Sequence, residues 1–306
     1  MIGFMNITIR QLKIFEVVAQ HLSYTRAAEL LFLSQPAVSM QIKQLESQIG
    51  LAIIEKVGKR LFLTEAGEEL LVYARTIINQ LTELDDVMDE LKGSQRGRLK
   101  IAVASTASSF SLKLLGEFYK RFPGSNISLD VTNRASLLNH LEDNTVDMVI
   151  MGRPPEGMNV EATSFMENEL VVVAEANHKL SNKTKIPLSV IQKETFIMRE
   201  HGSGTRIAME QFFRESGYDI SSVMEMSSND AINQAVEAGL GLSIVSRNTL
   251  RREIQLGQLT ILDVESFPIM RHWYLVHRKG KRITAIMAEF KHIVEKESAE
   301  ILNKSK

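Results

Sequence analysis

The stretch Tyr24–Gly67 constrains the fold of this chain more than any other part of its 306 residues. It begins with a short Ala-rich segment of helical spacing, which a polar break separates from a second amphipathic segment. In the second segment, four apolar residues fall on one face of a helix: Val38, Ile42, Leu45 and Ile49. Ser34 is suited to cap this helix and Gly50 to end it. The stretch therefore predicts two short helices joined by a tight turn.

A further predicted helix, roughly Arg10–Gln20, precedes this pair. A basic loop around Gly58 and a short apolar strand, Leu61–Leu63, follow it. This order of elements is that of a winged helix-turn-helix, which places one helix in the major groove of double-stranded DNA. We therefore predict a DNA-binding domain over residues 1–66.

The DNA contacts are expected on the outward face of the helix after Ser34, at the start of the preceding helix and in the basic loop. The candidate residues are Thr25, Ser34, Gln35, Pro36, Ser39, Met40, Lys43, Lys56, Lys59 and Arg60. Two alternatives stay open from the residues alone. Met40 is either an ordinary exposed Met or a contact to a thymine methyl group. The basic loop is either a solvated turn or a phosphate contact.

The charge distribution supports an interaction with nucleic acid that is local to the N-terminal region. Residues 1–63 hold seven Lys and Arg against four Asp and Glu, whereas residues 64–92 hold two against eight. The whole chain carries a net charge of −1. Because the basic excess is small, specific contacts and dimerisation must add to electrostatic attraction.

A regular heptad pattern runs through residues 67–92. Seven residues alternate at spacings of four and three: Leu70, Ala74, Ile77, Leu81, Leu84, Met88 and Leu91. Such a repeat is the requirement for a coiled-coil seam. Thr64 is suited to cap the start of this helix, and Glu65 suits its positive end. We predict a linker helix that dimerises with a second copy; the alternative is a helix buried against its own domain.

Residues 8–67 resemble the N-terminal domain of the LysR-type transcriptional regulators. The resemblance rests on Leu12 and Phe15, on Ser23–Leu45 with Glu46, and on Leu63–Glu68. It implies a cytoplasmic transcription factor that binds a pseudo-palindromic operator as a dimer, assembles further into a tetramer and works with RNA polymerase. Many members carry Arg where this chain has Met40 and Lys56.

Residues 93–306 alternate between apolar runs and helical patterns. The predicted strands are Leu99–Ala104, Ile127–Val131, Met148–Met151, Val171–Ala174, Phe196–Met198, Val223–Met226, Leu242–Val245, Leu259–Val264 and Met270–Arg278. The alternation predicts α/β units around mostly parallel sheets, after a hinge at Gly93–Gly97.

The family resemblance implies that residues 93–306 form a two-lobed α/β effector domain, built like a periplasmic binding protein. Lobe I is expected at about 98–166 and 265–306, and lobe II at about 167–264. The predicted fold class is therefore α+β and multidomain. It combines a winged helix-turn-helix, a long linker helix and this effector domain.

Candidate ligand groups lie where predicted strands end and helices begin, which is where open α/β sheets bind ligands. They are Ser105, Thr106, Asn133, Arg134, Gly152, Arg153, Ser203, Gly204, Thr205 and Asn229. Helix N-termini offer free N–H groups to anions, so the recurrence of these sites together with two Arg favours an anionic effector. The alternative is that the Ser, Thr and Asn side chains only cap helices. His272, Trp273 and His277 fit core or rim positions of a strand better than ligand positions.

Four segments resemble the LysR-type subgroup that controls carbon-dioxide-fixation (Calvin cycle) operons. They are residues 150–157, 198–206, 227–247 and 267–282. This resemblance implies that the effector is a phosphorylated metabolite or a reduced dinucleotide. A regulator of another pathway, such as sulfur or nitrogen metabolism, remains the alternative.

Other function classes fit the sequence poorly. The chain has no Cys, its seven His lack metal-site spacing, and no run is long enough for a membrane span. We therefore expect no metal, no cofactor other than the effector, and no membrane partner. No nucleophile elbow or dinucleotide fingerprint indicates an enzyme. A solute-binding protein would explain the two lobes, but not the N-terminal domain.

Overall fold

The computed structural model describes residues 6–91, 97–220 and 222–303. The chain divides into two compact units. The first comprises the residues up to Leu91 together with Asp143–Thr145, and the second comprises the rest. Most of the hinge predicted at Gly93–Gly97, and the domain boundary predicted at 92/93, lie outside the described residues. Within the described part, no helix is both long and apolar enough to cross a membrane.

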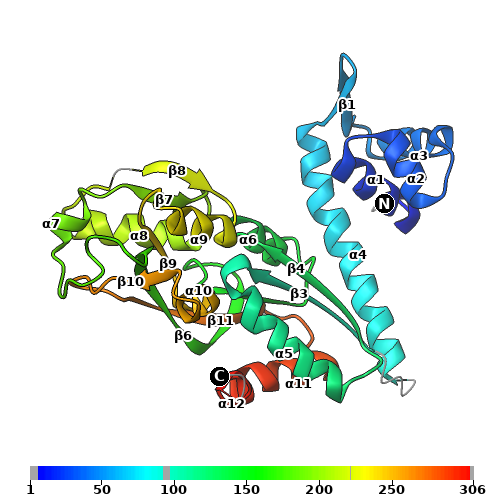
Figure 1. Ribbon diagram of the computed structural model, residues 1–306. Coiled ribbons are helices and arrows are strands. Elements are labelled where there is room, and N and C mark those ends of the chain that lie inside the picture. Colours follow the sequence, from blue (N-terminus) through cyan, green and yellow to red (C-terminus); the bar gives the residue numbers. More distant parts are fainter. Residues whose placement is uncertain (1–5, 92–96, 221, 304–306) are drawn as a thin grey trace. The chain divides into compact units, whose positions relative to one another are not determined.

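The first unit consists of three helices, a two-stranded wing and a long helix (Figure 1). They are α1 (Ile9–His21), α2 (Tyr24–Leu31), α3 (Gln35–Ile49), β1 (Ile54–Val57), β2 (Arg60–Leu63) and α4 (Glu65–Leu91). Polar caps set the helix starts: the side chains of Thr8, Ser23 and Ser34 each accept a backbone N–H in the first turn of α1, α2 and α3. The inward faces then close one core, which includes Phe15, Ala27 and Leu45.

Two local features fix the wing against α3 and α4. The carboxylate of Glu46 on α3 accepts the backbone N–H groups of Ile53 and Ile54, at 3.0 and 3.4 Å. A Cβ on Gly67 would overlap the carbonyl oxygen of Ile53, so α4 can start against the wing only with Gly at this position. At the tip, Gly58 takes a positive φ of 62°, which a Gly adopts without steric cost.

The predicted heptad residues of α4 divide between two environments. Ala74 is fully buried and Leu70 is partly buried, and both pack in the core of the first unit. The later seam positions are exposed except Leu81, which is partly buried. Two neighbouring apolar residues near the start of the helix are exposed as well. The exposed apolar residues of α4 are Val72, Tyr73, Ile77, Leu84, Met88 and Leu91. Leu70 and Ala74 therefore follow the burial alternative, as does Ile78 beside the repeat, while an apolar stripe continues along the rest of the helix.

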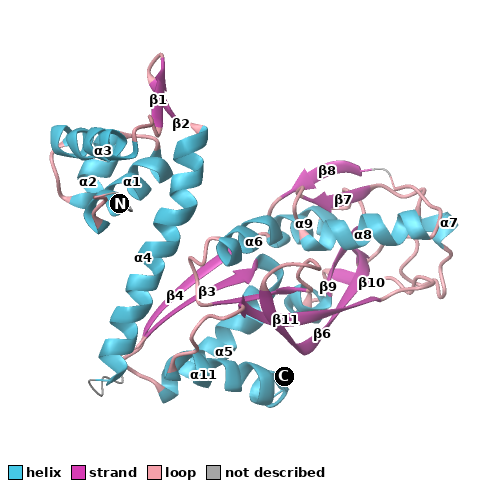
Figure 2. Ribbon diagram, turned by 180° about the vertical axis from the view of Figure 1, so that it is seen from behind, coloured by secondary structure: helices cyan, strands magenta, loops and turns pink. Residues whose placement is uncertain are grey.

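The second unit begins with lobe I, in which helices cover both faces of a sheet (Figure 2). Its elements are β3 (Arg98–Ala104), η1 (Ser105–Ala107), α5 (Ser108–Arg121), β4 (Asn126–Thr132), α6 (Arg134–Glu142), β5 (Met148–Gly152), β11 (Ile269–Arg278), α11 (Ala285–His292), a π-helical segment Ile293–Glu297 and α12 (Ser298–Asn303). Residues of α5 and α11 form the core on one face of the sheet, and residues of α6 form it on the other. Both faces of the central strands are consequently buried.

Lobe II follows β6 (Val160–Glu175). Its elements are α7 (Leu188–Ile191), β7 (Phe196–Arg199), α8 (Gly204–Glu215), β8 (Ser222–Met226), α9 (Asn229–Glu237), β9 (Ser243–Ser246), η2 (Arg247–Thr249), α10 (Arg251–Gln255) and β10 (Leu259–Ile261). Two further cores lie here, one including Phe196 and Phe213 and the other including Ile197 and Val236.

The long strands β6 and β11 run through both lobes and make the main sheet mixed. Its order is β10-β6-β11-β5-β3-β4, with β9 also paired to β6. The pairs β3–β4, β3–β5 and β7–β8 are parallel, but every pairing of β6 and β11 is antiparallel. The expectation of mostly parallel sheets was therefore wrong. The first half of β6 mixes polar and apolar residues and is mostly exposed, so it lacks the apolar run that marks the other strands.

Candidate nucleic-acid interface and ligand cavity

The outward side chains of α3 form one open surface in the first unit. Gln35, Pro36, Ser39, Met40 and Lys43 line it, together with Gln44 and Ser47. The opposite face of α3 is buried through Val38, Ile42 and Leu45, so the side chains that remain free are those predicted to reach DNA. Met40 is 53% exposed, and both interpretations of this residue stay open.

The remaining DNA candidates lie at the helix starts and on the wing. Thr25 is exposed in the first turn of α2, and Ser34 accepts the backbone N–H of Ala37 at 3.4 Å. Lys56, Lys59 and Arg60 are exposed around the wing turn. Among the described residues, none of these three cations has a carboxylate within ion-pair distance. Their charge is thus available to a phosphate group.

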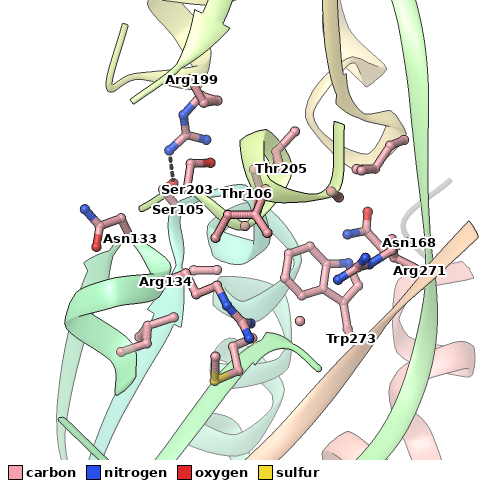
Figure 3. A pocket seen from close by; sticks show the side chains of 18 of the residues that line it. Ser105, Thr106, Asn133, Arg134, Asn168, Arg199, Ser203, Thr205, Arg271 and Trp273 are labelled. Carbon is pink, nitrogen blue, oxygen red and sulfur yellow. Dashed lines mark hydrogen bonds between the residues drawn. The ribbon is translucent and has the colours of Figure 1, made fainter. Parts of the chain in front are cut away.

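The second unit contains a cavity of about 220 Å³ between its lobes. It lies beyond the carboxyl ends of β3, β4 and β5 and faces the end of β7 and the start of α8 (Figure 3). Eight of the predicted ligand residues line it: Ser105, Thr106, Asn133, Arg134, Gly152, Ser203, Gly204 and Thr205. Parallel strand ends and a helix N-terminus meet here, as expected for this class of sheet.

Two predicted ligand residues lie outside the cavity. Arg153 follows the last residue of β5, and its side chain is 68% exposed and faces Glu156 at 3.6 Å. Asn229 lies behind the cavity wall, where its Oδ1 accepts from Nη1 of Arg199. Side-chain direction, which sequence position alone does not specify, separates Arg153 from Arg134.

The capping alternative holds for Asn133 and fails for Ser203. Oδ1 of Asn133 accepts the backbone N–H of Ser136 at 3.0 Å. Next to the predicted ligand Asn229, Ser228 caps α9 by accepting from Ala231. Ser203 occupies the N-cap position of α8 but makes no side-chain capping bond, although it is only 3% exposed. Its hydroxyl is therefore placed in the cavity wall without a capping role.

Six further polar or aromatic residues line the cavity and were not among the predicted ligands. They are Thr132 on β4, Asn168 on β6, Arg199 on β7, Gln211 on α8, and Arg271 and Trp273 on β11. The guanidinium of Arg199 forms an ion pair with Glu200 and donates to Ser105 Oγ in the other lobe at 3.0 Å (Figure 3). Alternate residues of a strand share a face, so Arg271 and Trp273 could have been found together only if the cavity side of β11 had been known.

The electrostatics of the cavity are strongly one-sided. Arg134, Arg199 and Arg271 line it, and no Asp or Glu does so among the described residues. Burial lowers the pKa of the Arg134 guanidinium, and the positive charge of Arg271 lowers it further. Glu200 offsets the charge of Arg199, but in the described part of the chain neither Arg134 nor Arg271 has a carboxylate partner. The cavity thus holds two uncompensated positive charges.

Comparison with known proteins identifies both units. Residues 9–68 match the family of bacterial regulatory helix-turn-helix proteins of the lysR family, and residues 92–299 match the LysR substrate binding domain. The RuBisCO operon transcriptional regulator of Allochromatium vinosum is 51% identical over 96% of this chain and 98% of its own length. The transcriptional regulator CbbR of Rhodospirillum rubrum is 46% identical over 91% and 92%.

Solved structures agree with this assignment. The CcmR regulatory domain of Synechocystis in complex with 2-PG is 39% identical, with a TM-score of 0.64, over 66% of this chain and 98% of that domain. Full-length CbnR, at 22% identity and a TM-score of 0.69 over 95% and 100%, shares the fold. The chain belongs to the LysR family of bacterial transcriptional regulators.

Proposed function

We propose that this protein regulates transcription of a carbon-dioxide-fixation operon and that a small anionic metabolite in the interlobe cavity controls it. The relatives named above support the operon, and the bound 2-PG of the Synechocystis domain supports a small-molecule effector. The protein acts on DNA in the cytoplasm together with RNA polymerase.

The observation that carries the effector class is the lining with three Arg and no acidic residue among the described residues. Charge-assisted hydrogen bonds to phosphate or carboxylate are the strong ones, and an Arg fork matches both groups. The free N–H groups at the start of α8 add donors for an anion. Arg134 and Arg271 together favour a ligand with two acidic groups.

Cavity size favours a small metabolite over a dinucleotide. Sites for drug-sized ligands measure roughly 300–1,000 Å³, and this cavity is smaller, at about 220 Å³. Titration calorimetry with 2-PG, sugar phosphates, inorganic phosphate and a reduced dinucleotide tests the class. We expect binding of the small phosphorylated acids. The proposal would be contradicted if uncharged analogues bound and none of these anions did.

The exposed side chains of α3 support direct reading of the operator. Replacing Gln35 with Ala is expected to cost about 1–3 kcal/mol at cognate sites, because a bidentate base contact is lost. Replacing Lys43 with Ala is expected to weaken all sequences alike and to flatten the salt dependence. Mobility-shift titrations at several salt concentrations separate the two effects.

Gln48→Ala is the matched control for this pair, because Gln48 is exposed on α3 but outside the surface lined by Gln35 and Lys43. Its operator affinity should equal that of the parent protein. If Gln35→Ala and Lys43→Ala also bind like the parent protein, α3 does not enter the groove in this way.

The control mechanism that we propose is a population shift. The effector binds one arrangement of the two lobes more tightly than the other, and α4 of two copies conveys this difference to a pair of DNA-binding domains. An effector that binds both arrangements equally tightly does not change the equilibrium between them, however high its affinity. The exposed apolar stripe of α4 supports pairing of two copies, and a tetramer is a pair of such dimers.

A further inference from the structure

The indole N–H of Trp273 is a buried donor whose hydrogen bond is missing. The side chain is 2% exposed and lines the cavity. Among the described residues, its Nε1 has no hydrogen-bond partner. Buried polar groups in folded proteins are nearly always paired, because an unpaired donor loses its water without compensation. In Figure 3 the indole nitrogen of Trp273 lies beside the guanidinium of Arg271.

Packing alone does not explain why this residue is Trp. The ring packs against Phe110, with the ring centroids 5.5 Å apart, and contributes to the core of lobe I. An apolar side chain such as Phe would fill part of the same space without burying an unpaired donor. The N–H is therefore the part of the side chain that needs an explanation.

Asn168 places a second neutral donor at the same wall. It lies opposite Arg271 in the pairing of β6 with β11 and is 7% exposed. The buried hydroxyl of Ser246 donates to its Oδ1 at 2.7 Å, which leaves the amide nitrogen for the cavity. In Figure 3 Asn168, Arg271 and Trp273 lie together on one side, while Arg134 projects from another element.

We propose that Trp273 and Asn168 form a specificity subsite, which donates two neutral hydrogen bonds to an oxygen of the acidic group that Arg271 binds. The inference rests on the proposed function of the cavity. The three side chains present donors towards the ligand, so the subsite accepts a carboxylate or phosphoryl oxygen and disfavours an amine. Inorganic phosphate has no second acidic group, and the other donors of the cavity can bind it without the subsite. The subsite therefore adds affinity only for a ligand with a second acidic group.

Trp273→Phe tests this, because it keeps a six-membered aromatic ring and removes the pyrrole part of the indole with its N–H. We expect the affinity for 2-PG to fall about tenfold or more, as for a lost hydrogen bond to a charged group, while the affinity for inorganic phosphate changes little. The melting temperature without ligand should fall, because the smaller ring leaves a space in the core of lobe I, so the comparison of 2-PG with inorganic phosphate in the same variant is the readout of the subsite. Tyr274→Phe is the matched control, since Tyr274 is the neighbour on β11 that does not line the cavity; its 2-PG affinity should be unchanged.

The parent protein offers a second measurement that needs no substitution. Trp273 is the only Trp of the chain, so its ultraviolet resonance Raman spectrum reports one indole N–H. Addition of 2-PG should shift the N–H band towards the hydrogen-bonded form. If the band does not move and Trp273→Phe binds 2-PG like the parent protein, the subsite is wrong although the cavity binds anions. If no anion of the panel binds the parent protein, the proposed function fails as well.

Discussion

Replacing Arg134 and Arg271 together with Ala is expected to abolish measurable binding of the anionic effector. Each charge-assisted contact contributes about 1.5–3 kcal/mol, so loss of both should weaken binding at least about a hundredfold. The fold should survive, because neither guanidinium has a carboxylate partner among the described residues, and their mutual repulsion is relieved. Calorimetry of ligand binding and thermal unfolding without ligand measure the two effects separately.

Arg153→Ala is the matched control for this experiment. The sequence places Arg153 at a strand end as it does Arg134, but its side chain is 68% exposed and outside the cavity. The effector affinity of this variant should be unchanged. An unchanged affinity in the double variant would show that the effector binds elsewhere. A lowered melting temperature with unchanged affinity would give the two arginines a structural role instead.

Leu84→Asp is expected to separate the dimer. Leu84 is 50% exposed in the middle of the apolar stripe of α4, so pairing of two such helices would bury it. Burying an unpaired carboxylate there costs several kcal/mol, and the variant should sediment as a species of half the mass with much weaker operator binding. The substitution leaves the core of the first unit intact, because Leu84 does not belong to it.

Thr82→Asp introduces the same charge on another side of α4. At roughly 100° per residue, Thr82 lies about one-third to one-half of a turn around the helix from the residues of the stripe. This control should keep the dimer and its operator affinity. A Leu84→Asp variant that remains fully dimeric would place the subunit contact on a surface other than the stripe of α4.

The DNA-binding unit could be predicted from sequence because its determinants are local. Ser34 and Gly50 bound α3 as expected, and the buried face of α3 holds Val38, Ile42 and Leu45. The division of the α4 heptad residues between buried and exposed positions could not be predicted. Ala74 and Leu84 both fit one heptad pattern, and only the position of the other helices decides which of them is covered by the same chain.

The cavity was predicted on one wall and missed on the other. Residues such as Ser105 and Thr205 follow strand ends or start helices, and those places can be recognised along the chain. Asn168, Arg271 and Trp273 lie within long strands that are distant in sequence and meet only through antiparallel pairing. Because residues 160–170 of β6 were not recognised as part of a strand, nothing indicated that Asn168 faces the same cavity as β11.

Operator binding of the full-length protein with and without effector tests the central claim most directly. The DNA is the region upstream of a carbon-dioxide-fixation operon, and the proteins are the parent and the Arg134→Ala, Arg271→Ala double variant. We predict that 2-PG changes the operator affinity of the parent protein by about 5- to 150-fold, the usual range of coupling between two sites. The double variant should bind the same DNA but not respond. No response of the parent protein, or an equal response of the double variant, would contradict control of DNA binding through this cavity.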